Sequence, residues 1–148
     1  MDGDDKTRFL MLSWVTALNR SVGGNHAKKI LIVDDEPNII VPLEFLMEQN
    51  HYDVKVADTG EKALDLIENY NPDLILLDIM LPGMDGYEVC QKIKMNPRFK
   101  TMKIVFLSAM ARSIDIAKGM GLTADDYITK PFSNAHVVDR INELLKDK

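Results

Sequence analysis

The sequence predicts an α/β fold in which helices cover both faces of a parallel sheet. Three short segments are almost entirely apolar, which is typical of strands that are buried on both faces. The stretches between such runs repeat apolar residues every three or four positions, the spacing of amphipathic helices. Strand and helix patterns alternate five times, and this order favours parallel strands joined by crossover helices.

Five segments have strand patterns of differing strength. The nearly continuous apolar runs are 29–33, 73–77 and 103–107. Segment 52–57 alternates more between apolar and polar residues, which indicates a less central strand. Segment 125–129 is a short candidate for the fifth strand, and its own pattern is weak.

The five expected helices follow these strands in turn, at 37–50, 59–70, 85–95, 111–121 and 133–146. Thr59 is the expected N-cap of the second helix, and Ser133 begins the fifth. Gly121 is expected to end the fourth helix. Pro42 lies inside the first helix, where its ring and its missing N–H would kink the helix or delay its start.

Residues 1–28 form a leader that is separate from the expected single domain at 29–148. Leu10, Trp14 and Leu18 have the spacing of an apolar helix stripe, and a Gly-Gly-Asn linker follows them. Two interpretations stay open. The leader is either disordered, or it is a helix that docks on another surface or forms a dimer.

Charge and composition exclude several classes of protein. The net charge is -5 and no stripe rich in arginine and lysine is present, which argues against nucleic-acid binding. No segment has the roughly 18 continuous apolar residues that a membrane span needs. The single cysteine, Cys90, excludes an internal disulfide and a CxxC metal site. These features favour a cytoplasmic protein without a membrane span.

Polar side chains follow four of the five expected strands. Asp34 and Asp35 follow the first strand, and Asp78 follows the third. Ser108 follows the fourth strand, and Lys130 follows the fifth. In an open α/β sheet the carboxyl ends of the strands meet at one edge, where ligands bind. We therefore expect three carboxylates, a hydroxyl and an ammonium in one shallow pocket.

Such a pocket suits phosphoryl chemistry around a metal ion. Crowded carboxylates repel one another, and a divalent cation keeps them ionised. Oxygen ligands favour Mg²⁺ or Mn²⁺ over zinc, and a bound cation can hold a phosphoryl group against a carboxylate nucleophile. Asp78 is the favoured nucleophile, because it ends the most apolar strand and the turn at 81–83 then directs the chain away. Lys130 would neutralise charge on the phosphoryl oxygens, and Ser108 would donate a hydrogen bond to one of them.

Each motif taken alone also has a purely structural interpretation. An Asp-Asp pair before a proline, such as Asp34 and Asp35, is often a helix N-cap. Asp85 in the turn after the third strand could simply cap the next helix. It is the combination at successive strand ends that favours a functional site.

Four segments resemble the signatures of response-regulator receiver domains of the CheY-like superfamily. They are VDDEP at 33–37, LLDIMLPGMDGYE at 76–88, FLSA at 106–109 and DDYITKPF at 125–132. The resemblance covers about residues 29–146 and implies a flavodoxin-like, doubly wound (βα)5 fold with strand order 2-1-3-4-5. The sequence departs from the family at Pro42 inside the first helix, at Thr123, where glycine is common, and in the leader, which has no family counterpart.

The same resemblance implies a metal site and a phosphoacceptor. Asp78 would accept the phosphoryl group, and Asp34 and Asp35 would be the acid pair that binds Mg²⁺ or Mn²⁺. The backbone carbonyl of Met80 would bind the metal as well, beside the side chains of Asp34, Asp35 and Asp78.

It also implies a switch. Lys130 matches the family's lysine, Ser108 its hydroxyl switch and Tyr127 its aromatic switch, although an ordinary half-buried strand tyrosine is the alternative for Tyr127. On phosphorylation, Ser108 would move toward the phosphoryl group and Tyr127 would turn inward. The surface of the fourth helix, fifth strand and fifth helix would then change.

The partners that the resemblance implies are proteins. A sensor histidine kinase or a histidine phosphotransfer protein would supply the phosphoryl group, and a downstream partner would read the switched surface. The chain would be a stand-alone receiver or a fragment of a larger regulator, and a homodimer stays open. It would not be an enzyme, apart from its own phosphorylation and dephosphorylation.

Two other functions compete with this interpretation. A phosphatase of the haloacid-dehalogenase type needs a second aspartate two residues after the nucleophile, where Met80 cannot transfer a proton. A nucleotide- or flavin-binding module cradles phosphate in a glycine- or hydroxyl-rich loop, whereas the loop at 34–37 is acidic. Turnover of a phosphate ester would favour the first alternative, and flavin absorbance the second.

Overall fold

The computed structural model describes residues 27–110 and 112–146. The interpretations of the leader as disordered or as a docking or dimerising helix concern residues 1–26, which lie outside the described part. The strands are β1 (Lys29–Val33), β2 (Asp53–Ala57), β3 (Leu74–Leu77), β4 (Lys103–Ser108) and β5 (Asp126–Thr129). The helices are α2 (Pro37–Gln49), α3 (Gly60–Tyr70), α4 (Gly86–Lys94), the 3-10 turn η1 (Pro97–Phe99), α5 (Ser113–Gly121) and α6 (Asn134–Leu145).

All strand pairs are parallel, and the order in the sheet is β2-β1-β3-β4-β5. The predicted doubly wound fold and its strand order are therefore confirmed. The expected boundaries differ most at α5, which begins at Ser113 rather than at residue 111. Ser108 is the last residue of β4 rather than the residue after it, so β4 is one position longer than expected.

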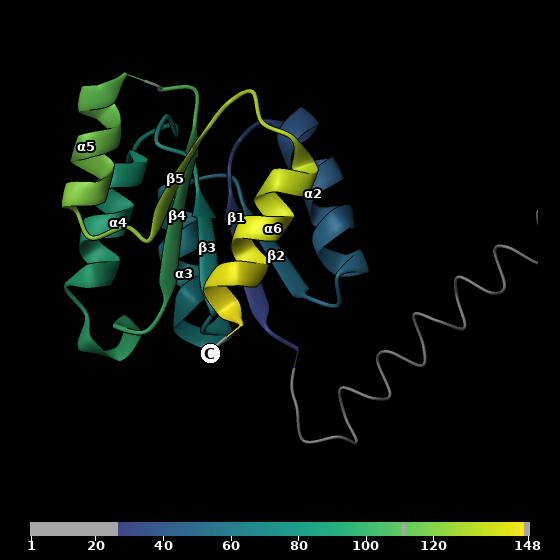
Figure 1. Ribbon diagram of the computed structural model, residues 1–148. Helices are drawn as coiled ribbons and strands as arrows, with labels where there is room; N and C mark the ends of the chain where they lie inside the picture. Colours follow the sequence, from purple (N-terminus) through teal and green to yellow (C-terminus); the bar gives the residue numbers. More distant parts are fainter. Residues whose placement is uncertain (1–26, 111, 147–148) are drawn as a thin grey trace, which may run out of the picture.

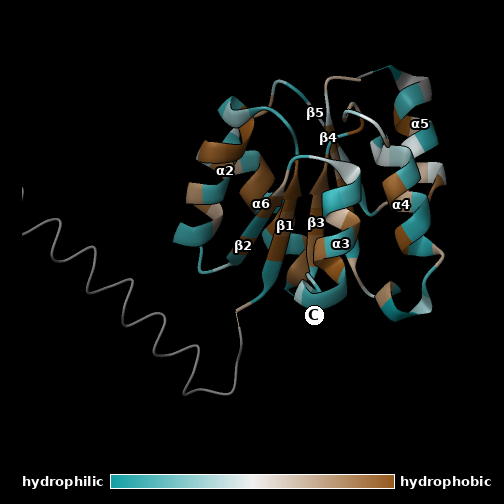
Figure 2. Ribbon diagram, turned by 180° about the vertical axis from the view of Figure 1, so that it is seen from behind, coloured by the Kyte–Doolittle hydropathy of each residue, from teal (hydrophilic) through white to brown (hydrophobic). Residues whose placement is uncertain are grey.

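The sheet lies between two layers of helices (Figure 1). Helices α2 and α6 cover one face, and α3, α4 and α5 cover the other (Figures 1 and 2). Each face has its own apolar core, and the central strands β1 and β3 between them are largely brown, meaning hydrophobic, in Figure 2. All four residues of β3 are 0–1% exposed. Burying such a side chain contributes about 1.5–3 kcal/mol to the free energy of folding, so the hydrophobic effect holds β3 at the centre of the sheet.

Local signals set the helix starts. The Thr59 hydroxyl accepts a hydrogen bond from the Lys62 N–H, which confirms the expected N-cap. Ser133 and Asp85 cap α6 and α4 in the same way, so the structural interpretation of Asp85 is correct. Helix α2 begins at Pro37 and continues through Pro42. The delayed start considered for this helix because of Pro42 does not occur. The helix begins instead at Pro37, where a proline in the first turn already has the helical φ and needs no N–H partner.

The departure from the family at Thr123 coincides with an unusual backbone conformation. Thr123 follows α5 with a φ of 65°, in the left-handed region that glycine adopts without steric cost. A β-branched residue is strained there, because its Cβ lies too close to the backbone. Glycine, the residue that the resemblance leads us to expect here, would adopt this φ without steric strain, whereas threonine does not.

Among residues 27–110 and 112–146, no helix is long and apolar enough to cross a membrane.

Candidate functional site

Two buried carboxylates lie side by side at the carboxyl edge of the sheet. Strands β1 and β3 pair so that Val33 is opposite Leu77, and the next residue in each strand is an aspartate. The Asp78 N–H donates a hydrogen bond to the Val33 carbonyl at 2.9 Å, which continues the ladder past the strand ends. Asp34 and Asp78 are only 1% and 3% exposed. The sequence order and the register alone therefore bring these two side chains together.

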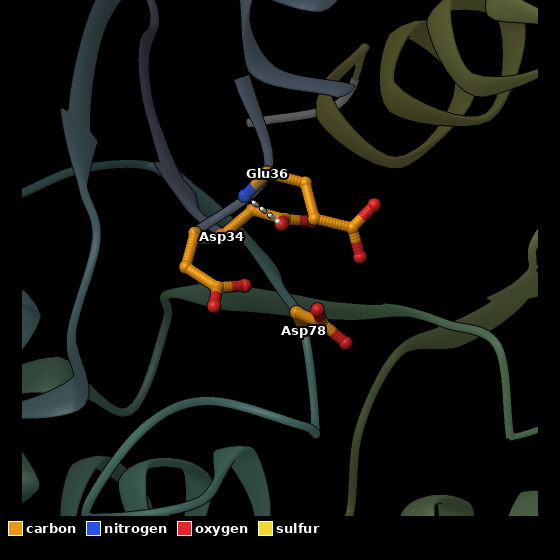
Figure 3. A group of neighbouring side chains, drawn as sticks. Asp34, Glu36 and Asp78 are labelled. Atoms are coloured by element: carbon orange, nitrogen blue, oxygen red, sulfur yellow. Dashed lines mark hydrogen bonds between the residues drawn. The ribbon is translucent and has the colours of Figure 1, made fainter. Parts of the chain in front are cut away.

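The loop after β1 adds two further carboxylates. Asp35 and Glu36 are exposed, and one oxygen from each lies within 4.8 Å of those of Asp34 and Asp78. Figure 3 shows Asp34 and Glu36 leaving this loop toward Asp78, which comes from the end of β3. The Glu36 N–H donates a hydrogen bond to Asp34 Oδ1 at 2.9 Å and fixes the loop. We call these four residues the acidic cluster.

Lys130 is the cation of this site. Its Nζ lies 3.0 Å from Asp34 Oδ2, 3.2 Å from Asp78 Oδ2 and 3.4 Å from Glu36 Oε1, and its side chain is only 10% exposed. The Lys130 N–H donates to the Ser108 carbonyl at 2.8 Å, and this bond ties the end of β5 to the end of β4. The Lys130–Pro131 peptide bond is cis.

The ionisation of the site reflects burial and pairing. Burial raises the pKa of Asp34, although the Glu36 N–H and Lys130 partly offset this effect. Burial by itself would lower the pKa of Lys130, but the hydrogen bond to Asp34 and the charge of Asp78 outweigh it and raise the pKa. One ammonium faces four carboxylates, so the pocket keeps an excess of negative charge.

The residues of the acidic cluster fit a small divalent cation. All four offer carboxylate oxygens, the ligand type that Mg²⁺ and Mn²⁺ prefer. Two ligands on opposite sides of a magnesium ion are about 4.2 Å apart, given metal–oxygen distances of about 2.1 Å. Oxygens that lie within 4.8 Å of one another match this size closely. A cation there would also compensate the excess negative charge that Lys130 leaves.

The backbone of Met110 connects the two predicted switch residues. Ser108 is fully buried, and its Oγ accepts a hydrogen bond from the Met110 N–H at 3.4 Å. The half-buried Tyr127 donates its hydroxyl hydrogen to the Met110 carbonyl. Its ring packs at 5.8 Å between centroids from Phe106, in the core beneath α5. Ser108 and Tyr127 therefore meet at one loop residue beyond β4.

Met80 lies at the mouth of the site with 65% of its area exposed. Its N–H donates to Asp78 Oδ1 at 3.3 Å, so the backbone here faces the carboxylate. The metal-binding role of the Met80 carbonyl stays a prediction. An open hollow of about 640 Å³ adjoins this point, and Asp35, Tyr87 and Lys118 are among its lining residues.

Sequence reasoning placed Asp34, Asp35, Asp78 and Lys130 together, and the structure brings them together. It did not include Glu36 in the site, although the carboxylate of Glu36 joins the cluster and contacts Lys130. The sequence did contain a signal for Glu36, because a residue in the short loop between β1 and α2 must lie near the carboxyl edge of the sheet. The role of Met110 as a shared partner had no sequence signal, since only its backbone takes part.

Comparisons with known proteins point to one family. A family model described as the response regulator receiver domain matches residues 30–142. A candidate response regulator from Chloroflexus aurantiacus is 34% identical with a TM-score of 0.77, over 81% of this chain and 98% of that chain. The receiver domain of Francisella response regulator 1452 is 33% identical with a TM-score of 0.75, over 81% and 98%. The BeF3-activated N-terminal receiver domain of Klebsiella pneumoniae RstA is 30% identical with a TM-score of 0.74, over 80% and 99%.

Proposed function

Because the chain belongs to the response-regulator receiver family, whose members are signalling domains of two-component systems, we propose that it accepts a phosphoryl group on Asp78. The observation that carries the proposal is the buried Asp78 carboxylate, which has Lys130 Nζ at 3.2 Å and the Asp34 carboxylate beside it. The receiver domain of Klebsiella pneumoniae RstA, which was activated with BeF3, a phosphoryl mimic, has the same fold over 80% of this chain.

In the proposed reaction, an Asp78 oxygen attacks the phosphorus of a phosphodonor. The bond between phosphorus and the donor's leaving group breaks, and the leaving group keeps the bonding electrons. Asp34, Asp35 and Asp78, with the Met80 carbonyl, would hold Mg²⁺ or Mn²⁺, which would supply charge neutralisation for the phosphoryl oxygens. Lys130 already contacts Asp78 and would pair with a phosphoryl oxygen after transfer.

The Ser108 hydroxyl would move toward the phosphoryl group and donate a hydrogen bond to it, and this movement would break the bond that Ser108 Oγ accepts from the Met110 N–H. The loop at Met110 would then move, and Tyr127 is bonded to the same residue. Such a local charge event can bias two packings of the surface formed by α5, β5 and α6. A downstream protein partner would read this surface, which is the fourth-helix, fifth-strand and fifth-helix surface expected from the sequence.

The donor would be a sensor histidine kinase or a histidine phosphotransfer protein. Helix α2 begins at Pro37, directly after the acidic cluster, so a protein that delivers a phosphoryl group to Asp78 would lie against its first turns. The hollow beside Met80 would give the phosphoryl donor access to the site. We expect no turnover of other substrates, since the position two residues after Asp78 holds a methionine that cannot transfer a proton.

Intact mass spectrometry of the full chain with acetyl phosphate and Mg²⁺ tests the proposal. We expect the mass of one added phosphoryl group in the natural chain, none in Asp78→Asn, and addition as before in Asp58→Asn. Asp58 is the matched control, because it follows β2 at the same edge but is exposed and pairs with Lys62. Addition that persists in Asp78→Asn would refute the assignment.

A further inference from the structure

One exposed apolar surface lies on α2, the helix that follows Glu36 of the acidic cluster. Val41 and Phe45 are 63% and 53% exposed. They are four residues apart, so they lie next to each other on one face of the helix. Pro42 beside them is also exposed. We call Val41, Pro42 and Phe45 the α2 patch. Adjacent large apolar side chains on a surface favour a site that another element covers.

The charges around the α2 patch narrow the choice of occupant. Helix α2 contains no lysine or arginine, and Glu44 and Glu48 are its only charged residues. Glu48 is exposed and Glu44 is half-buried. A complementary occupant therefore presents an apolar helix face with basic residues near it.

The leader of this chain has that character. Leu10, Trp14 and Leu18 repeat every four residues, the same spacing as Val41 and Phe45. Arg8 and Arg20 flank the apolar run on either side. The arginines of the leader thus complement the glutamates of α2, and the apolar residues of both segments have the same four-residue spacing.

The place where the leader joins the domain brings it to α2. The Lys28 carbonyl accepts a hydrogen bond from the Asp53 N–H at 2.9 Å, and the Tyr52 N–H donates to Met47 in α2 at 3.1 Å. The chain therefore enters the domain beside the C-terminal end of α2 (Figure 1). The linker at 19–27 reaches about 30 Å when extended, and α2 is about 20 Å long.

We propose that residues 9–18 bind as an amphipathic helix across the α2 patch of the same molecule, with Arg8 and Arg20 near the glutamates of α2. The short tether gives the leader a high effective concentration at α2, so a modest intrinsic affinity is enough. The bound leader covers the helix that follows the acidic cluster and competes with any protein that docks there. The binding itself does not depend on the proposed phosphoryl transfer.

Trp14 makes this binding directly measurable, because it is the only tryptophan of the chain. In the full chain we expect Trp14 emission at shorter wavelength than that of a synthetic peptide of residues 1–26, and slower quenching by iodide. In the double variant Val41→Lys with Phe45→Lys, emission and quenching are expected to become those of the peptide. Equal emission of the natural chain and the peptide would overturn the proposal.

Two further variants make the test specific. Met95→Lys changes an apolar residue that is 76% exposed at the end of α4, and it is expected to leave Trp14 emission unchanged. Arg8→Glu with Arg20→Glu keeps the α2 patch intact and is expected to shift emission toward the peptide value. Emission that is insensitive to both double variants would overturn the proposal. So would a shift that grows with protein concentration together with a dimer mass in light scattering, because the occupant would then be a second copy. Acetyl phosphate labelling of Asp78, measured by intact mass in the same samples, tests the proposed function separately.

Discussion

The acidic pocket and the aromatic packing beneath α5 lie at neighbouring strand ends, yet different forces hold them. In the pocket, Lys130 Nζ contacts Asp34 and Asp78 at 3.0 and 3.2 Å. Beneath α5, Tyr127 is held by ring packing against Phe106 and by one hydrogen bond to the backbone. Separating buried charges is costly, whereas a ring can exchange one set of apolar contacts for another. The proposed chemistry therefore rests on fixed groups, whereas the proposed switch uses adjustable ones.

Both regions also depend on the space beside a glycine. A Cβ atom built on Gly119 of α5 would lie 2.9 Å from Tyr127 Cδ2 and 3.0 Å from Phe106 Cδ2. The tyrosine ring therefore occupies space that exists only because residue 119 is glycine. The acidic pocket also depends on a glycine, because a Cβ atom built on Gly86 would collide with the backbone of Asp78 and lie 2.8 Å from Ile79 Cα.

The largest expected effect comes from removing the cation of the pocket. Lys130→Met leaves Asp34 and Asp78 buried without their partner, and we expect a loss of about 3 kcal/mol in the free energy of unfolding. Urea denaturation at neutral pH measures it. Lys62→Met is the control, because Lys62 forms an exposed ion pair with Asp58, and such pairs contribute about 0–1 kcal/mol. Equal effects of the two substitutions would show that the pocket is not held by charge.

Gly119→Ala tests the adjustable region. The added methyl group forces the ring of Tyr127 or Phe106 to move, and we expect a loss of about 1–3 kcal/mol in the free energy of unfolding. Gly121→Ala in the same helix meets no atom within 4 Å, so it is expected to stabilise by about 0.5–1 kcal/mol through helix propensity. Opposite signs for these two alanines would support the packing described here. A stabilising Gly119→Ala would contradict it.

A smaller effect is expected where the chain leaves α5. Thr123→Gly removes the steric strain of a β-branched residue at a φ of 65°, and we expect a gain of about 1 kcal/mol in unfolding free energy. Asn71→Gly is the matched control, because asparagine tolerates its φ of 52° far better than threonine does. Differential scanning calorimetry of both variants compares the gains. A larger gain for Asn71→Gly would argue against strain at Thr123.

The fold was predictable because each level of the sequence agrees with the others. The apolar runs at β1, β3 and β4 are buried on both faces, and the helix patterns between them require parallel crossovers. The strand order, however, came from the resemblance, since apolar runs do not say which strands are neighbours. Thr123 shows the opposite case, in which a sequence departure marks a strained backbone whose φ the sequence alone does not give.

The candidate site was predictable only in part. Asp34, Asp78 and Lys130 follow strand ends, and parallel topology brings strand ends to one edge. The bond from Tyr127 to the Met110 carbonyl depends on a loop conformation, which residue types do not specify. The space at Gly119 depends on how α5 packs over Phe106 and Tyr127, and only coordinates reveal it.

The acidic cluster of Asp34, Asp35, Glu36 and Asp78 is the proposed site of one divalent cation. Isothermal titration calorimetry of the full chain with Mg²⁺ measures this binding. One bound Mg²⁺ is expected in the natural chain and in the control Asp58→Asn, and binding is expected to weaken at least tenfold in Asp34→Asn. Unchanged Mg²⁺ affinity in Asp34→Asn would show that the acidic cluster does not bind the ion.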